Sequence, residues 1–258
     1  MRVAALYDIH ANLPALEAVL DDVRAADVDL IVVGGDVVPG PMPCETLALV
    51  LSMGVRTQFI CGNGELAVLA QLDAANPDAV TYWGTTSGEP LPEPLREVLR
   101  WTARQIRRDY ENVLRTWPRT FRLRIDGLGD VLFCHGTPRS ETESFTRLTP
   151  EGRLLPVFLG LNVSLVVCGH THMPFDRAIG GVRVVNAGSV GMPFGRPGAD
   201  WLLLAPEVEL RQTSYDLTRA ADRVRSTAYP EAAAFAAGSI LSPPSEASML
   251  DAFTNASF

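Results

Sequence analysis

The sequence predicts an α/β fold with a layered sheet, because short apolar runs of strand type alternate with segments of helical period. Six runs rich in β-branched residues, each followed at once by polar or glycine residues, are expected to be buried strands: residues 2–7, 30–33, 57–61, 131–134, 165–168 and 182–185. Such alternation favours a ligand site in the loops at the carboxyl ends of the strands.

Two helices are expected early in the chain. In residues 14–26 the apolar side chains recur at helical spacing, with Asn12 near the N-cap and Pro14 in the first turn. A second helix is expected over residues 44–53, where Gly54 ends it. The chain therefore opens as strand, loop, helix, strand.

We expect a single domain over residues 1–258, because a chain of 258 residues with 47% hydrophobic composition can bury one sizeable core. Residues 66–117 are expected to form a helical insertion, with a Gly/Pro-rich loop at 84–94 and a helical stretch at 95–114. The arginines of this stretch form either a solvated helix face, which we favour, or a basic lip over a phosphate site: Arg96, Arg100, Arg104, Arg107 and Arg108.

Residues 211–258 are expected to form a helical tail, with short helices at 217–225 and 230–237. Its Ser/Pro-rich end has little capacity to pack and is either loosely ordered or a packing arm. The apolar residues of this end could pack on a partner or back on the body of the protein, so the sequence leaves the oligomeric state open.

Composition and charge exclude several classes of protein. No run approaches the roughly 18 apolar residues of a membrane span, and the apolar start is too short for a signal peptide, so we expect a cytoplasmic protein without a membrane partner. A net charge of −8 argues against broad binding to nucleic acids. Neither disulfides nor thiolate metal sites are expected, because no Cys-x-x-Cys spacing occurs among Cys44, Cys61, Cys134 and Cys168.

Five short motifs each follow a predicted strand, and together they contain all four histidines: Asp8-Ile9-His10, Gly35-Asp36, Gly62-Asn63, His135-Gly136 and Gly169-His170-Thr171-His172. An extended backbone points residues i and i+2 to the same side, so we expect the two spaced pairs to meet a common centre. Alone, Asn63 could be a turn residue and Asp36 could cap a loop. Taken together, the five motifs offer imidazole, carboxylate and amide donors without thiolate, a set of ligands that suits Mn, Fe, Co, Ni or Zn.

With these motifs in this order, residues 1–200 resemble the calcineurin-like metallophosphoesterases, and in particular their small bacterial and archaeal phosphodiesterase-like members. The family series is Asp-x-His, Gly-Asp, Gly-Asn-His-Asp/Glu, His and Gly-His-x-His. Residues 101–118 and the loop 186–191 add weaker similarity. The resemblance implies a four-layer α-β-β-α sandwich with two facing mixed sheets and a helical insertion.

The resemblance also implies two divalent metal ions and assigns their ligands. One ion would be held by Asp8, His10 and His172, and the other by Asn63, His135 and His170. Asp36 would bridge them, and both Asp36 and Asn63 would serve catalysis. Two nearby cations need a shared anionic ligand, which agrees with a bridging carboxylate. A hydroxide between the metals would attack phosphorus, and manganese is the occupant we favour among Mn, Fe, Ni, Co and Zn.

One position departs from the family series. Gly64 stands where most phosphomonoesterases of the family have a histidine, so the residue that would protonate the leaving group is missing. Such an acid contributes about a hundredfold to ten-thousandfold and matters most for poor leaving groups. We therefore expect a phosphodiesterase that takes a small phosphodiester, with aryl or nucleotide diesters as candidates. Glu65 could supply the proton instead, but we favour a role at the N-terminus of the following helix.

Two alternatives remain from the sequence. The protein could be a phosphomonoesterase or protein phosphatase, or it could be a non-catalytic scaffold with the same fold. The expected metal ligands are complete, which favours an enzyme. The substrate-binding residues cannot be named from the sequence.

Overall fold

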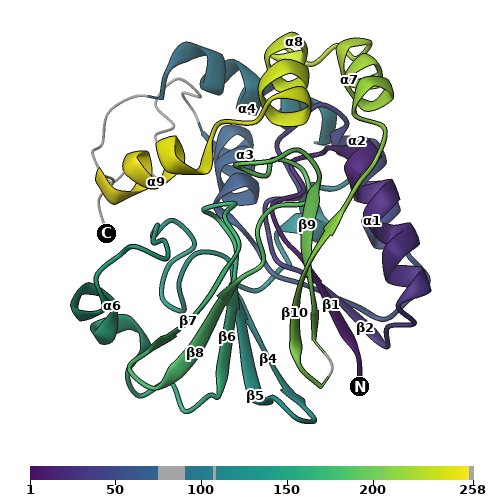
Figure 1. Cartoon of the computed structure of the whole chain (residues 1–258). Helices are drawn as coiled ribbons and strands as arrows, with labels where there is room; N and C mark the ends of the chain where they lie inside the picture. Colours follow the sequence, from purple (N-terminus) through teal and green to yellow (C-terminus); the bar gives the residue numbers. More distant parts are fainter. Residues whose placement is uncertain (75–90, 107–108, 205, 256–258) are drawn as a thin grey trace.

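In the computed structural model two five-stranded sheets face each other, and helices cover both outer sides (Figure 1). The structure describes residues 1–74, 91–106, 109–204 and 206–255. The first sheet contains, in spatial order, β10 (Val208–Thr213), β9 (Ala199–Leu204), β1 (Val3–Leu6), β2 (Leu30–Val33) and β3 (Thr57–Phe59). The second contains β4 (Thr120–Ile125), β5 (Gly129–Cys134), β6 (Leu165–Cys168), β8 (Val182–Asn186) and β7 (Phe175–Ile179).

Both sheets mix parallel and antiparallel pairs. In the first sheet β1, β2 and β3 are parallel, while β9 runs antiparallel to β1 and to β10. In the second sheet β5, β6 and β8 are parallel, and β4 and β7 are antiparallel edge strands. The parallel strands carry their C-terminal loops to the same side of the molecule, the side of α3 (Asn63–Asp73) and α4 (Glu93–Ile106) in Figure 1.

Strand alternation divides the apolar residues between the layers. Along β1, Val3 and Ala5 face the second sheet, whereas Ala4 and Leu6 face the helices. The layer between the sheets also includes fully buried Phe133. The central strands of both sheets are buried on their outer faces too, so helices cover both outer sides, and the predicted four-layer sandwich with two mixed sheets is confirmed.

The helices of the first sheet come from the first half of the chain. They are α1 (Leu13–Ala25), α2 (Pro43–Leu51), α3, α4 and α5 (Glu111–Leu114), and their apolar faces form one cluster with the sheet. The expected N-cap of α1 is confirmed, since Asn12 accepts a hydrogen bond from the Ala15 N–H at 3.3 Å. On the second sheet, α6 (Glu151–Phe158) covers the outer face.

The predicted stretch 95–114 is two helices, α4 and α5, and α4 begins before it. Arg96 and Arg100 form ion pairs with Glu93 in the first turn of α4, at 2.5 and 3.0 Å, and Arg104 is exposed. Arg107, Arg108 and most of the predicted loop 84–94 lie outside the described residues.

The tail contains more structure than the sequence indicated. The chain is still in β10 at residues 211–213, α7 (Leu217–Arg225) has its expected bounds, and α8 (Ala232–Phe235) leads into a π-helix (Ala236–Leu241). The Ser/Pro-rich end forms α9 (Glu246–Asn255), in which Leu250 is buried. Of the two interpretations of this end, the packing arm is therefore the correct one.

Four strands were not predicted from continuous apolar runs in the sequence. β4, β7 and β10 lie at sheet edges or carry charged residues on a solvent face, so their apolar residues alternate with polar ones. β9 is buried on both faces, and its apolar run at 201–204 is typical of a buried strand, although no strand was predicted there. Without β9 and β10 the sequence could not predict that the chain returns to the first sheet beside β1.

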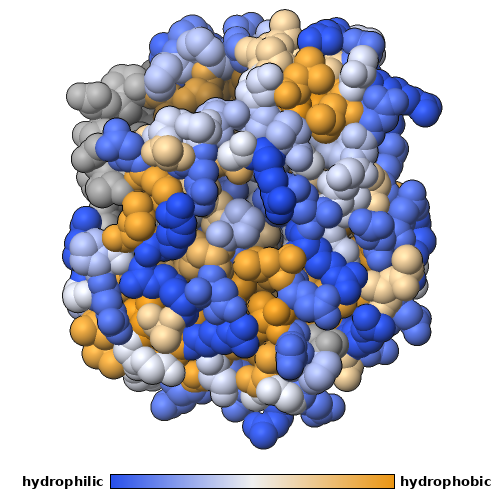
Figure 2. Space-filling view, viewed as in Figure 1, coloured by the Kyte–Doolittle hydropathy of each residue, from blue (hydrophilic) through white to orange (hydrophobic). Residues whose placement is uncertain are grey.

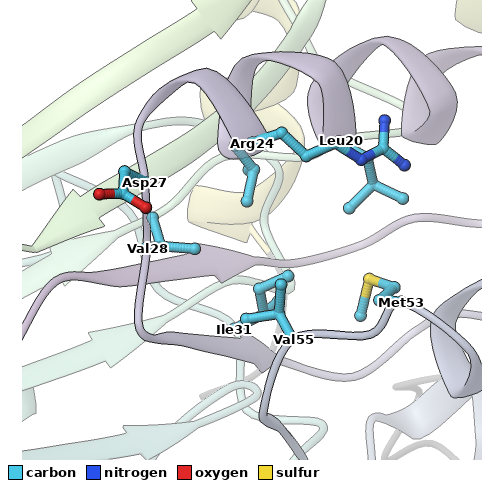
Figure 3. A pocket seen from close by; sticks show the side chains of 8 residues that line it. Leu20, Arg24, Asp27, Val28, Ile31, Met53 and Val55 are labelled. Carbon is cyan, nitrogen blue, oxygen red and sulfur yellow. The ribbon is translucent and has the colours of Figure 1, made fainter.

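Hydrophilic and hydrophobic residues are mixed on one face of the molecule (Figure 2). Figure 2 shows hydrophobic residues in small groups between hydrophilic ones on the face of Figure 1. A pocket of about 180 Å³ lies between the end of α1 and the residues before β3, lined by Leu20, Ile31 and Met53 with Arg24 and Asp27 at its side (Figure 3). Within the described ranges, no helix combines the length and apolarity needed to cross a membrane.

Candidate metal centre

The five motifs meet between the two sheets, at the carboxyl ends of the parallel strands. Each donor residue lies directly after a strand, and two sheets contribute: Asp8 and His10 follow β1, Asp36 follows β2, Asn63 begins α3 after β3, His135 follows β5, and His170 and His172 follow β6. All of these residues except His170 are buried. Parallel strands therefore place the motifs where the sequence predicted a ligand site.

Asp8 lies at the centre of two overlapping groups of donor atoms. One group contains Asp8, His10 and His172, the other contains Asp8, Asp36 and His135, and the atoms within each group lie within 4.8 Å of one another. The Oδ1 atom of Asp8 is 3.3 Å from Nε2 of His172, 3.8 Å from that of His135 and 3.9 Å from that of His10.

Asp36 reaches both groups through its two oxygens. Its Oδ1 lies 3.5 Å from Nε2 of His135, and its Oδ2 lies 3.9 Å from Nε2 of His10. The carboxylate of Asp36 therefore lies between a histidine of the first group and a histidine of the second. In this structure Asp8 is the member shared by the two groups, and Asp36 contacts one histidine of each.

Asn63 and His170 flank the cluster on the side of His135. The Oδ1 atom of Asn63 lies 3.0 Å from Nε2 of His135, and the rings of His135 and His170 meet edge to face with centroids 5.2 Å apart. His170 also donates its backbone N–H to Oδ2 of Asp8 at 2.8 Å, while its Nε2 lies 2.9 Å from the hydroxyl of Ser144. The structure thus brings all seven predicted ligands together, and their individual roles remain predictions.

The backbone at these residues is left-handed, which corrects the expected geometry. The φ angles are 53° at Asp8, 47° at His10, 53° at Asp36, 66° at His170 and 56° at His172. Extended pairs were predicted to point their side chains to one side, and that reason is wrong. Tight turns after the strands aim the side chains inward instead, at a conformational cost of about 1 kcal/mol or more per residue.

Hydrogen bonds to backbone carbonyls orient two of the imidazoles. Nδ1 of His172 lies 2.8 Å from the carbonyl of Met192, and Nδ1 of His135 lies 2.9 Å from the carbonyl of Gly34. A protonated Nδ1 that donates to a carbonyl leaves Nε2 as the lone-pair donor, which faces Asp8 in His172 and faces Asn63 and Asp36 in His135. This is the orientation that metal ligation by Nε2 requires.

The pKa values within the cluster reflect burial and strong coupling between charges. Burial opposes ionisation of Asp8, but His172, His135 and His10 together hold its pKa below the usual range. Burial raises the pKa of Asp36 to about 7, against the opposing effect of His135. Burial likewise lowers the pKa of His10 to about 3 and that of His170 to about 3. Both imidazoles are therefore neutral near pH 7, and a neutral imidazole has one nitrogen lone pair that can bind a cation.

The donor set fits divalent cations. Oδ1 of Asp8 is buried and makes no hydrogen bond among the described residues, although Nε2 of His172 lies 3.3 Å from it. The Nε2 atoms of His10 and His172 face each other at 3.1 Å, where only one of them can carry a proton. A buried carboxylate oxygen without a hydrogen bond, opposite several imidazole lone pairs, is satisfied by a cation of the nitrogen- and oxygen-binding class.

Glu65 joins two of the loops that carry the predicted metal ligands, and its place in the sequence indicated only part of this role. Its carboxylate accepts hydrogen bonds from the backbone N–H groups of Gly62 at 2.8 Å, Asp36 at 2.9 Å, Val37 at 2.7 Å and Val38 at 3.1 Å. Burial raises the pKa of Glu65, and these donors oppose that shift. The predicted place in the first turn of α3 is correct, but the side chain also fixes the loop after β2.

The loop after β8 ties together the turns that carry Asp8 and His170. Asn186 donates to the carbonyl of Gly169 at 2.6 Å, and Ser189 donates to the carbonyl of Asp8 at 2.7 Å. The backbone of Gly191 also donates to the Asp8 carbonyl, at 3.0 Å. These residues were noted in the sequence only as a stretch similar to the family. Their function is to connect turns from different sheets, which no local pattern reveals.

Gly64 is held by close backbone packing. Its N–H donates to Oδ1 of Asp36 at 2.6 Å. An added Cβ would lie 2.9 Å from that oxygen and within 2.3 Å of the carbonyl oxygen of Val38. The loop after Asp36 thus occupies the space in which a side chain at position 64 would begin. A histidine at this position would require the backbone of Val38 to move.

Comparisons with known proteins agree with this fold and site. Residues 1–207 match the family described as the calcineurin-like phosphoesterase superfamily domain. The chain therefore belongs to the calcineurin-like phosphoesterases, a family of metal-dependent phosphoester hydrolases. An uncharacterized protein of Methanocaldococcus jannaschii is 26% identical over 250 residues, which cover 89% of this chain and 94% of that protein.

Two solved structures are similar over nearly the whole chain. A metallophosphoesterase from Sphaerobacter thermophilus has 26% identity and a TM-score of 0.67, with 93% of this chain and 99% of that chain covered. A hypothetical protein from Pyrococcus horikoshii has a TM-score of 0.75 at 20% identity, with 91% and 97% covered, and shows the same fold.

Replacement of Glu65 by glutamine is expected to lower the free energy of unfolding by at least about 2 kcal/mol, because an amide NH2 would then face backbone N–H donors. Urea unfolding of the metal-free protein measures this change. Glu97→Gln, on an exposed part of α4, is the matched control and should unfold like the parent chain. Equal stability of the two variants would contradict the role assigned to Glu65.

Gly64→Ala is expected to cost about 1–3 kcal/mol of stability, because the new methyl group meets the Val38 carbonyl. Gly152→Ala in α6 is its control, since an added Cβ there has nothing within 4 Å and alanine favours a helix. Thermal and urea unfolding of both variants provide the comparison. A Gly64→Ala variant as stable as the control would show that the loop yields easily.

Metal affinity is expected to fall as the pH is lowered below about 7. Asp36, whose pKa is raised to about 7, holds a proton below that pH in the metal-free protein, and a cation must displace it. One displaced proton corresponds to about a tenfold weaker affinity per pH unit. Calorimetric titration with Mn²⁺ at pH 6, 7 and 8 measures this change, and a constant affinity would show that Asp36 ionises normally.

Proposed function

We propose that the protein is a phosphodiesterase that uses two divalent cations, with manganese the favoured metal, and that its substrate is a small phosphodiester. The observation that carries this proposal is the position of the four histidines. All four lie in the cluster around Asp8, so none is left to protonate a leaving group. Substrates with good leaving groups, such as aryl or nucleotide diesters, lose least when a general acid is missing.

The packing at Gly64 supports the same proposal. The position where phosphomonoesterases of the family carry the acid is filled by the backbone of Val38. Glu65, the nearest carboxylate in sequence, is fully buried and accepts four backbone N–H groups. Because both of its oxygens accept these hydrogen bonds, Glu65 is poorly placed to donate a proton to a substrate and is a poor substitute for the missing histidine.

Each residue of the site has a distinct part in the proposed reaction. Asp8, His10 and His172 would hold one cation, Asn63, His135 and His170 the other, and Asp36 would bridge them. Bound cations would supply positive charge to the phosphoryl oxygens and lower the pKa of a water nucleophile. By accepting a hydrogen bond from Nδ1, the carbonyls of Met192 and Gly34 would keep His172 and His135 in the tautomer that ligation by Nε2 needs. The N–H of Gly64 steadies Asp36 at the N-terminus of α3.

The similarity to a metallophosphoesterase at 26% identity supports an enzyme over a non-catalytic scaffold. The complete donor set points the same way, since a scaffold has no need of a buried carboxylate oxygen without a hydrogen bond. The net charge of −8 supports a small substrate over a long nucleic acid.

With Mn²⁺ added, kcat/KM for bis(4-nitrophenyl) phosphate is expected to exceed that for 4-nitrophenyl phosphate by at least about tenfold. His135→Ala should lower diester turnover at least about a hundredfold, whereas Glu97→Gln should leave it unchanged. A preference for the monoester would overturn the diesterase assignment. A protein that binds no metal and stays inert with Mn²⁺, Ni²⁺ and Co²⁺ would instead be a scaffold.

A further inference from the structure

A cavity of about 500 Å³ lies next to the metal centre, outside the cluster of metal-ligand candidates. Its walls come from three parts of the chain that are far apart in sequence. Met173 and Pro174 follow His172, residues 194–196 belong to the loop before β9, and Glu246 begins α9. Asp200, in β9, completes the lining. A volume of this size accommodates a ligand of nucleoside size.

The cavity and the metal centre share a wall. The ring of Phe194, which lines the cavity, stacks on the imidazole of His172 with centroids 5.1 Å apart and an interplanar angle of 20°. Met173, the residue after His172, lines the cavity as well. The cavity therefore lies on the His172 side of the metal centre.

The C-terminal tail contributes Glu246 to the lining and is held beside the cavity by several contacts. Gly195 donates its backbone N–H to the carbonyl of Pro244 at 2.9 Å, and Arg147 pairs with Glu246 at 3.2 Å. Phe253 of α9 contacts Phe194, with ring centroids 6.5 Å apart. In Figure 1 α9 lies above the loops of the second sheet. The tail thus has a definite position beside His172, which accounts for the order of a Ser/Pro-rich segment.

The lining favours a neutral group that donates hydrogen bonds. The charge of Glu246 is balanced by Arg147, and Arg196 lies close enough to Asp200 to favour its ionised form. With charges balanced, the cavity does not attract a second phosphate. Met173, Pro174 and Phe194 provide apolar surface for a flat ring.

Asp200 supplies the polar end of the cavity. Its residue is 4% exposed, and its Oδ1 accepts a hydrogen bond from Gln212 at 3.0 Å. Burial raises the pKa of Asp200 to about 7, so a further N–H donor from a ligand would stabilise the ionised carboxylate. The imino and amino groups at the edges of nucleobases are donors of this kind.

We propose that this cavity is the nucleobase subsite of the enzyme: it holds the base of a nucleoside phosphodiester between apolar side chains, and Asp200 accepts a hydrogen bond from the base. The subsite rests on the proposed phosphodiesterase function and names its substrate class. It also gives the tail a role, because α9 supplies one wall and fixes Phe194 against His172.

Two substrates with the same scissile bond isolate the contribution of the base. Thymidine 5′-(4-nitrophenyl phosphate) and methyl 4-nitrophenyl phosphate both release 4-nitrophenolate, but only the first carries a nucleoside. With Mn²⁺ the kcat/KM of the thymidine ester should exceed that of the methyl ester by at least about tenfold. Asp200→Asn should reduce this ratio about tenfold, because the charged acceptor is lost. Asp176→Asn, at an exposed ion pair on β7, is the matched control and should keep the ratio.

A binding measurement keeps the test independent of the folding of the Asp200 variant. In calorimetric titration of the unmodified protein with Mn²⁺ present, thymidine 5′-monophosphate should bind at least about tenfold more tightly than methyl phosphate. Equal affinities, or a ratio of kcat/KM near one with both esters hydrolysed, would overturn the subsite and leave the diesterase function intact. If neither ester is hydrolysed, the proposed function itself is refuted.

Discussion

The carboxylates of Asp8, Asp36 and Glu65 lie between the two sheets, away from water, and the rest of the site is arranged around the free energy of burying them. Each is compensated differently. Glu65 is surrounded by backbone N–H groups, and Asp36 receives one from Gly64. Asp8 keeps one oxygen without a hydrogen bond among the described residues, opposite three imidazoles. A cation would compensate the buried charge of Asp8. The same buried carboxylate thus explains both the electrostatics of the site and the metal dependence of the family.

The same constraint explains why the turns around the site are left-handed and heavily cross-linked. Turns at φ near +50° aim Asp8, His10 and Asp36 inward but are individually unfavourable. They persist because Glu65, Asn186 and Ser189 hold the turns through hydrogen bonds to backbone groups of neighbouring loops. Each sheet contributes part of the donor set, so the apolar layer between the sheets also sets the distances within the cluster.

Specificity is located in parts of the chain that differ from the metal centre in character. The motifs lie on short, buried turns, whereas the cavity beside His172 is lined by a loop and by the start of the C-terminal helix α9. Stacking of Phe194 on His172 links the two. Such a division lets the walls of the cavity vary without disturbing the ligands, because loops and tails tolerate substitution better than turns packed between sheets.

The sequence by itself determined the order of the motifs, the strands that precede them and therefore the family and the layered fold. Those features are local: a β-branched run, a glycine or an N-cap residue specifies its conformation within a few positions. The return of β9 and β10 to the first sheet, three of the four contacts of Glu65 and the wall built by α9 depend on residues more than twenty positions apart in the chain. The meaning of Gly64 also needed the tertiary structure. From the sequence it was a missing acid, but in the structure the carbonyl of Val38 occupies the space of its side chain, because two loops from neighbouring strands pack there backbone to backbone.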